Sequence, residues 1–122
     1  MEIKIVKDSI SKKELIDIAR GQFGNLVKAV VDVNQGIMAV GGEMHADEEM
    51  VLMEQEGSKR EYTWGINLYL EKTSDDWIEF DSVINLKPSF GNRSRDVDNP
   101  EIQKKIRNIV EKLVLYDEGQ RG

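Results

Sequence analysis

One segment of the chain alternates between apolar and polar or small residues over its whole length: Tyr62-Thr63-Trp64-Gly65-Ile66-Asn67-Leu68-Tyr69-Leu70-Glu71. A period of two is that of a β-strand with one buried face. After a turn at 73–76, residues 77–86 alternate in the same way, so the two stretches predict a β-hairpin. This hairpin decides the fold class, because each strand has one apolar face that a helix has to cover.

Two further strands are predicted upstream, at 26–33 and 36–42. The loop between them ends in Gly36, which is typical of a type I turn with a bulge and places Val33 opposite Ile37. On that register the inner face consists of Val27, Ala29, Val31, Val33, Ile37 and Ala39.

Two amphipathic helices are predicted from their start signals. Ser11 and Glu14 have the spacing of a capping box. Asn99 and Pro100 are typical of a helix cap and of a first helical position. Segment 47–55 is ambiguous, because the acidic residues at its start favour a short helix whereas the apolar block in its middle is equally compatible with a strand.

With a short strand at 3–6, these elements predict a single α+β domain over residues 1–116. We expect two layers: a mainly antiparallel sheet of four to five strands, with two or three helices packed on one face. The chain has 122 residues, enough for one core. Residues 117–122 are expected to form a frayed polar tail.

The composition excludes several classes of protein. Residues 43–90 carry twelve acidic and four basic residues within a net charge of −6. A region this acidic repels a phosphate backbone, so we expect no general nucleic-acid binding. No apolar run approaches the ~18 residues of a membrane span and no apolar leader is present, which predicts a cytoplasmic protein without a membrane partner. The absence of cysteine excludes disulfides and thiolate chemistry.

The outer face of the predicted hairpin carries five hydrogen-bonding side chains: Asn67, Tyr69, Glu79, Asp81 and Asn85. Two carboxylates two positions apart on one strand could hold a cation or divide the roles of general acid and general base. The alternative is that this surface is only the solvent-exposed side of an antiparallel sheet.

A second candidate site lies in the loop before the last helix and consists of Asn92, Arg93, Ser94 and Arg95. Arginine can bind a phosphate or carboxylate through two parallel hydrogen bonds, and serine adds a hydroxyl. The loop matches neither a Walker loop nor a dinucleotide fingerprint, so no cofactor is identified. The alternative is that the two arginines pair with acidic residues and only fix the loop.

His45 is the one histidine of the sequence. Together with Asp47, Glu79 and Asp81 it would form a metal site if the fold brought these residues together. Zinc usually requires more nitrogen or sulfur ligands than this chain offers, whereas Mg²⁺ accepts carboxylates. The alternative is that the acidic residues at 47–49 only favour the first turn of a helix. A serine hydrolase is disfavoured because the chain has no Gly-x-Ser-x-Gly turn.

Five short blocks of the sequence, taken as a set, look familiar: 27–32 (VKAVVD), 41–47 (GGEMHAD), 64–69 (WGINLY), 77–82 (WIEFDS) and 91–95 (GNRSR). This set resembles a family of small microbial proteins known as a domain of unknown function, and the resemblance covers nearly the whole chain. It implies a standalone single-domain protein and implies no activity.

Three functions are compatible with these residues, and whether the protein is an enzyme stays open. The leading hypothesis is a protein that binds a small anionic ligand, such as a phosphorylated molecule, at the 91–95 loop beside the polar sheet face. The first alternative is a metal-assisted hydrolase that uses Glu79, Asp81 and His45. The second alternative is a homodimer or interaction module that uses the outer face of the sheet. Its anchors would be Tyr69, Trp77 and Val30.

Overall fold

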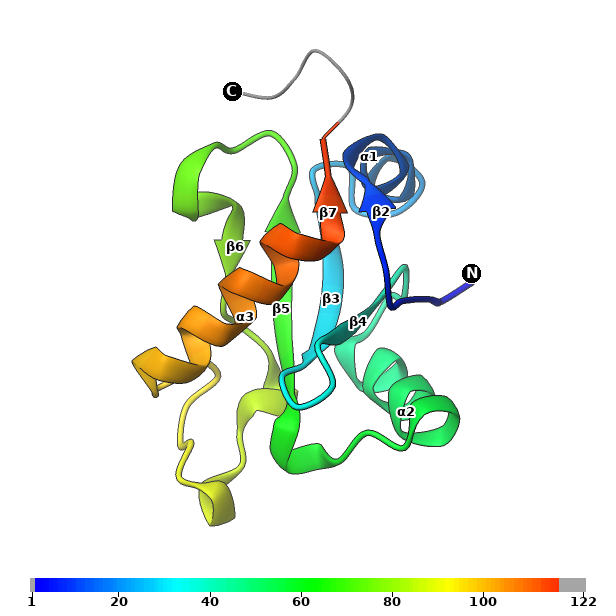
Figure 1. Ribbon diagram of the computed structural model, residues 1–122. Coiled ribbons are helices and arrows are strands. Elements are labelled where there is room, and N and C mark those ends of the chain that lie inside the picture. The colour runs from blue at the N-terminus through cyan, green and yellow to red at the C-terminus, as the bar shows by residue number, and fades with distance from the viewer. Residues whose placement is uncertain (1, 117–122) are drawn as a thin grey trace.

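A five-stranded antiparallel sheet lies at the centre of the molecule (Figure 1). The computed structural model describes residues 2–116. In spatial order the strands are β1 (Lys4–Val6), β4 (Ile37–Val40), β3 (Leu26–Asp32), β5 (Thr63–Tyr69) and β6 (Ile78–Glu79). The predicted α+β class with a mainly antiparallel sheet is confirmed. The predicted tail at 117–122 lies outside the described residues.

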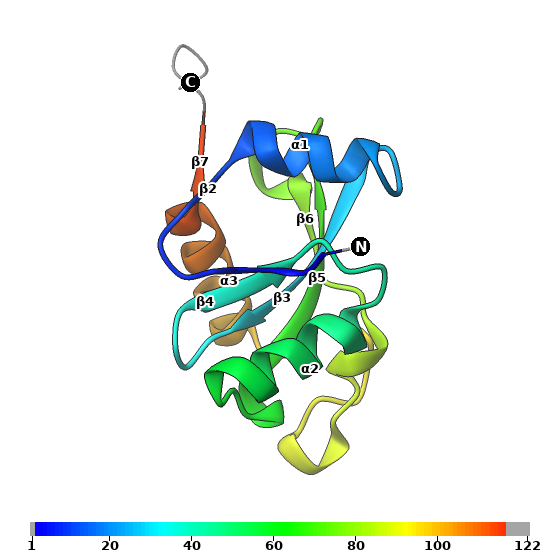
Figure 2. The same ribbon diagram turned by 90° about the vertical axis from the view of Figure 1, so that its right-hand side faces the viewer.

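The strands direct alternate side chains into two apolar clusters. The larger cluster lies between the sheet and the helices α1 (Lys12–Arg20) and α3 (Pro100–Leu113). Its strand residues include Val27, Ala29, Val31, Met38, Ile66 and Leu68. The smaller cluster joins Val30 and Ala39 to Leu52 of α2 (His45–Glu56) on the opposite face. Two helices therefore cover one face as predicted and α2 covers part of the other, with the sheet between α3 and α2 (Figure 2).

The ambiguous segment forms the helix α2, which ends at Gly57. Gly57 has a φ of 68°, a left-handed conformation that glycine adopts without strain and that commonly ends a helix. At the other end the N-cap position is occupied by Met44, whose side chain makes no capping hydrogen bond. This start differs from those of α1 and α3, which are capped by Ser11 and Asn99 as predicted.

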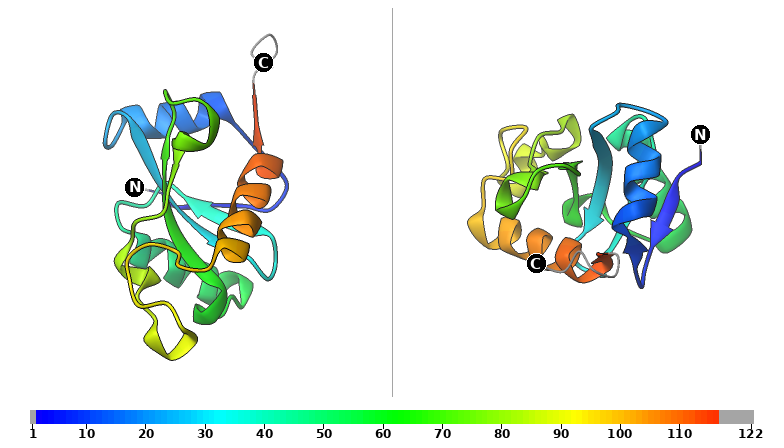
Figure 3. Two further views of the ribbon diagram at one scale, coloured as in Figure 1. Left: turned by 90° about the vertical axis from the view of Figure 1, so that its left-hand side faces the viewer. Right: turned by 90° about the horizontal axis from the view of Figure 1, so that it is seen from above.

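A short parallel pair joins the residues just before α1 to those just after α3. β2 (Ile10–Ser11) pairs with β7 (Val114–Leu115), and Ile10 lies opposite Val114 (Figure 2). Both side chains are buried in the larger cluster. The segment between β6 and α3 extends beyond the sheet at the end away from α1 (Figure 3).

The predicted register of the β3–β4 hairpin is wrong by one residue. Ile37 lies opposite Asp32 and not Val33, so Met38, rather than Ile37, faces α1 and α3. The cause is the side chain of Asp32, whose Oδ1 accepts hydrogen bonds from the backbone N–H groups of Asn34 at 2.8 Å and Gln35 at 3.1 Å. These bonds stabilise a four-residue loop in place of the predicted three-residue loop.

The second strand of the predicted hairpin is much shorter than 77–86. β6 contains only Ile78 and Glu79, and Val83–Asn85 form a 3₁₀ helix, η3. The side chain of Asn85 takes the place of the missing strand: its Oδ1 accepts from Gly65 N at 2.8 Å and its Nδ2 donates to Gly65 O at 3.0 Å. A side-chain amide therefore makes the two hydrogen bonds that a paired backbone would otherwise make.

Candidate functional site

A pocket of about 490 Å³ lies on the face of the sheet that carries α2. Its walls come from the start of α2, from β3, β5 and β6, and from the segment that follows β6. The charged and polar lining residues are Lys28, His45, Asn67, Tyr69, Glu79, Asp81, Ser82 and Arg95. The apolar ones are Met44, Ala46, Val83 and Ile84. A volume of this size is in the range of small-molecule sites.

Three lining residues form a row across the sheet. Lys28 of β3 lies opposite Asn67 of β5, which lies opposite Glu79 of β6. Asn67 Nδ2 donates to Glu79 Oε1 at 2.8 Å, and the Tyr69 hydroxyl donates to the same oxygen at 3.3 Å. Burial and the nearby Glu79 carboxylate raise the pKa of Tyr69, so its phenol stays a hydrogen-bond donor at neutral pH.

His45 occupies the first position of α2 and is 8% exposed. Its Nε2 lies 2.8 Å from the carbonyl oxygen of Ile66. Because a carbonyl only accepts, Nε2 carries the proton and Nδ1 is the acceptor of the ring. Burial lowers the pKa of His45, which keeps the imidazole neutral.

The floor of the pocket depends on a glycine. A Cβ at Gly65 would lie 2.6 Å from Ser82 Oγ and 3.1 Å from His45 Cγ. Both side chains therefore pack directly over the backbone of β5, in space that any larger residue would occupy.

The two cationic residues of the pocket differ in their partners. Arg95 Nε donates to Asp81 Oδ1 at 2.7 Å, whereas its two terminal nitrogens have no hydrogen-bond partner among residues 2–116. Lys28 is half-buried and makes no ion pair within the described part of the chain. Its ammonium lies 5.1 Å from the ring centroid of Phe23.

The rest of the 91–95 loop does not line the pocket. Ser94 Oγ donates to Asp98 Oδ1 at 2.6 Å and the backbone N–H of Arg93 donates to Asp98 Oδ2 at 3.0 Å. Asn92 is buried, and its Nδ2 donates to the carbonyl oxygens of Asn85, Ser94 and Asp96. Of the four predicted loop residues, the structure therefore places only Arg95 in the pocket.

The other predicted site residues divide in the same way. His45, Asn67, Tyr69, Glu79 and Asp81 line the pocket, whereas Asp47 does not. Asn85 is fully buried, is hydrogen-bonded to Gly65 and does not line the pocket. Among the side chains that the structure describes, no group of three His, Asp or Glu residues is arranged to hold a metal ion.

Two anchors predicted for an interaction surface are wrong. Trp77 is 7% exposed and Val30 is fully buried, because the larger cluster covers Trp77 and α2 covers Val30. Only Tyr69 is partly exposed.

Sequence reasoning missed several pocket residues. Lys28 could have been predicted, because strand alternation directs its side chain to the face opposite Val27 and Ala29. Ser82 and Val83 were not, because their positions depend on the chain leaving the sheet after Glu79.

No helix within residues 2–116 is long and apolar enough to cross a membrane. Comparison with curated proteins and with solved structures gives no match. A family model does match, over residues 4–113, and confirms the resemblance seen in the sequence. The chain belongs to the family described as protein of unknown function (DUF5674).

Proposed function

We propose that the protein binds a small anionic molecule in the pocket, with its negative charge between Lys28 and Arg95. The observation that carries the proposal is Lys28, a partly buried residue in the wall of a concave site that makes no ion pair with any of the described side chains. A bound anion would supply the ion-pair partner that Lys28 lacks, through a charge-assisted hydrogen bond.

Arg95 supports the same proposal from the opposite wall. Asp81 holds the guanidinium by Nε, so the planar group is oriented while its terminal N–H groups stay available. An oriented guanidinium is suited to a phosphate or carboxylate, because it donates parallel hydrogen bonds to two oxygens. This retains the predicted role of the 91–95 loop for one of its residues.

The test is a titration of the ¹⁵N-labelled protein with inorganic phosphate, followed by ¹⁵N–¹H correlation spectra. We expect saturable shifts at Lys28, Asn67 and Arg95. Arg95→Gln and Lys28→Met should each weaken binding about tenfold or more, because each removes a charge-assisted hydrogen bond.

Arg93→Gln is the matched control, because Arg93 lies in the same loop outside the pocket. It should leave the affinity unchanged. Equal losses in the Arg93 and Arg95 variants would indicate a general charge effect and contradict the proposal, as would full affinity in the Arg95 variant.

A second candidate is a hydrolase, favoured by the position of a neutral His45 in the same pocket as Glu79 and Asp81. In this function His45 Nδ1 would take a proton from the attacking water. The measurement is p-nitrophenol release from p-nitrophenyl phosphate, with and without Mg²⁺. Turnover that disappears in His45→Gln would favour the hydrolase. If the protein releases no p-nitrophenol, the hydrolase is contradicted for this substrate and the binding function is favoured.

A further inference from the structure

The pocket has an apolar side that the bound anion does not explain. Met44 and Val83 line it and are 58% and 61% exposed. They come from two different elements, the start of α2 and the start of η3. Ala46 and Ile84 extend the same surface into the pocket.

The position of Met44 conflicts with the local rules of helix formation. An N-cap is normally Ser, Thr, Asp or Asn, whose side chain binds an unpaired backbone N–H of the first turn. Met44 gives up that bond and instead presents a long apolar side chain beside the pocket. Conflicts of this kind are expected at functional sites. Methionine also adapts its shape to the surface of a ligand.

We infer that the ligand is amphiphilic: its anionic group lies between Lys28 and Arg95, and an apolar body of about the size of an aromatic ring covers Met44 and Val83. The inference rests on the proposed function and adds the class of molecule, an organic phosphate or carboxylate in place of a simple inorganic anion. The charged side of the pocket sets the orientation of the ligand, and the apolar side supplies burial.

Phenyl phosphate and inorganic phosphate are the two probes, because they share the anionic group and differ by one ring. We expect phenyl phosphate to bind about tenfold more tightly or more, since the ring removes apolar surface from water on both sides of the contact. Both dissociation constants come from the same ¹⁵N–¹H titration.

The variants Met44→Ala and Val83→Ala test the contact with the apolar part of the ligand independently of the contact with its anionic group. Each should weaken phenyl phosphate about threefold to tenfold and leave inorganic phosphate unchanged. Met44→Leu should retain the affinity, because it keeps an apolar side chain at that position. Met50→Ala is the matched control: Met50 is on the same helix and is also 58% exposed, but it does not line the pocket.

Two outcomes would overturn the inference. Phenyl phosphate would bind no more tightly than inorganic phosphate, or the Met50 variant would lose as much affinity as the Met44 variant. In either case inorganic phosphate that still depends on Lys28 and Arg95 would leave the anion site standing. If neither probe shifts the resonances of Lys28 and Arg95, the proposed function fails as well.

Discussion

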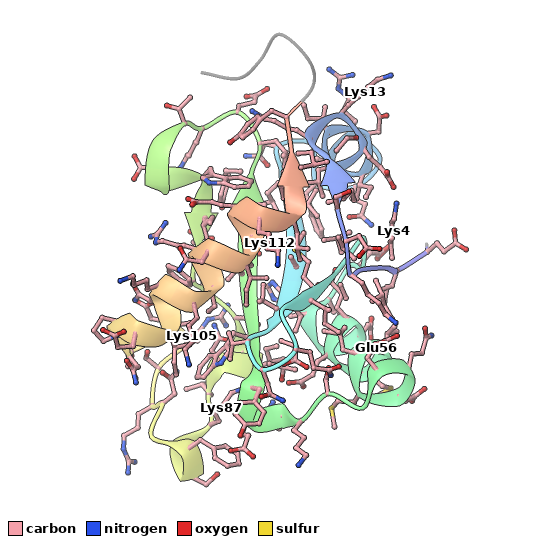
Figure 4. The ribbon with its side chains drawn as sticks, in the orientation of Figure 1. Lys4, Lys13, Glu56, Lys87, Lys105 and Lys112 are labelled. Atoms are coloured by element: carbon pink, nitrogen blue, oxygen red, sulfur yellow. The ribbon has the colours of Figure 1, made fainter. Side chains whose placement is uncertain are left out.

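Lys87 shows how a buried charge can hold separate segments together. The side chain is 3% exposed, and its ammonium donates to the carbonyl oxygens of Arg60 and Thr63. It also lies 4.2 Å from the ring centroid of Trp64, near the first residues of β5 (Figure 4). Burial lowers the pKa of Lys87 to about 8, and the nearby Glu49 carboxylate partly opposes this shift.

We expect Lys87→Met to reduce the free energy of unfolding by about 1 to 3 kcal/mol, because the Thr63 carbonyl loses a buried donor and the Arg60 carbonyl keeps only its bonds from Thr63. The loss should also depend on pH. Lys87 releases its proton near pH 8 in the folded protein and near its ordinary value of 10.5 in the unfolded chain. The folded state therefore gains stability as the pH rises through this interval.

Urea denaturation between pH 7 and 10 measures this effect. The difference between the original protein and Lys87→Met should widen with pH, whereas Lys104→Met, at an exposed helical position, should show neither the loss nor the widening. A difference that narrows with rising pH would contradict the account of Lys87.

Glu48 is a second buried ionisable residue, but only one of its two carboxyl oxygens is hydrogen-bonded within the described part of the chain. Its Oε2 accepts from Gly42 N at 2.9 Å, and its Oε1 has no hydrogen-bond partner among the described residues. Burial raises the pKa of Glu48 well above its ordinary value, because desolvation disfavours the charged carboxylate, and the hydrogen bond from Gly42 partly opposes this shift. A Cβ at Gly42 would lie 2.7 Å from Glu48 Cγ, which explains why a glycine faces it.

Among the elements, β5 was predictable and β6 was not. In β5 the alternation is real: Trp64, Ile66 and Leu68 face the larger cluster, as their spacing predicts. Residues 77–86 have the same spacing, but the chain leaves the sheet after Glu79. Hydrophobic periodicity cannot reveal that the amide of Asn85 replaces a backbone ladder, because this replacement depends on three-dimensional proximity to Gly65.

The register predicted for the β3–β4 hairpin was wrong for a related reason. Its composition permits both a three-residue and a four-residue loop, and the choice depends on the side chain of Asp32. Asp32 also accepts from Ser58 Oγ at 2.6 Å, which joins the loop to the residue after α2. The local bonds from Asn34 and Gln35 to Asp32 set the four-residue loop, and the contact with Ser58 adds a link between distant segments that the sequence pattern does not reveal.

Asn85→Ala tests whether the side-chain amide of Asn85 attaches the segment after β6 to β5. Gly65 N–H and C=O would lose their partners, and we expect a loss of about 2 to 4 kcal/mol in the free energy of unfolding. Hydrogen exchange gives the sharper readout, because the Gly65 amide should exchange faster in this variant while the amide of Ile66 changes less.

Asn108→Ala, at an exposed position of α3, is the control and should change neither quantity by much. Unchanged protection of the Gly65 amide in Asn85→Ala would show that the segment after β6 does not depend on this amide.

For the whole molecule, the fold class followed from the sequence but the strand order did not. Alternating faces and capped helices are local properties, so an α+β domain could be predicted from them. The position of β3 between β4 and β5 pairs segments about 40 residues apart, such as Val27 with Leu68. Lys28 enters the pocket only through that pairing, because it brings Lys28 beside Asn67.

Six predicted residues line the pocket: His45, Asn67, Tyr69, Glu79, Asp81 and Arg95. They were named from a strand pattern, from the loop before the last helix and from the single histidine of the sequence, and none of these local features shows that His45 lies beside the strand residues. The other three residues of the predicted anion loop do not line the pocket: Ser94 Oγ and the backbone N–H of Arg93 donate to Asp98, and Asn92 is buried.

The β2–β7 pair makes a prediction for the molecule as a whole. It ties the start of α1 to the end of α3 through buried Val114 and Ile10. Val114→Ala should reduce the free energy of unfolding by about 1 to 3 kcal/mol, because it leaves a cavity between the two helices.

Leu115→Ala is the control on the same strand, because Leu115 is 51% exposed. It should cost less than about 0.5 kcal/mol. Equal losses in the two variants, measured by urea denaturation, would mean that the pair does not hold the ends together.

Residues 80–95 supply one wall of the pocket without forming a continuous strand. Asn85 attaches this segment to β5, and Asn92 fixes its turns from within. Val83 and Arg95 can therefore change without breaking any strand pair. The sheet therefore keeps its strand pairing independently of the chemistry of this wall, so substitutions at Val83 and Arg95 would change the surface of the pocket while Asn85 and Lys87 keep the segment attached to the sheet.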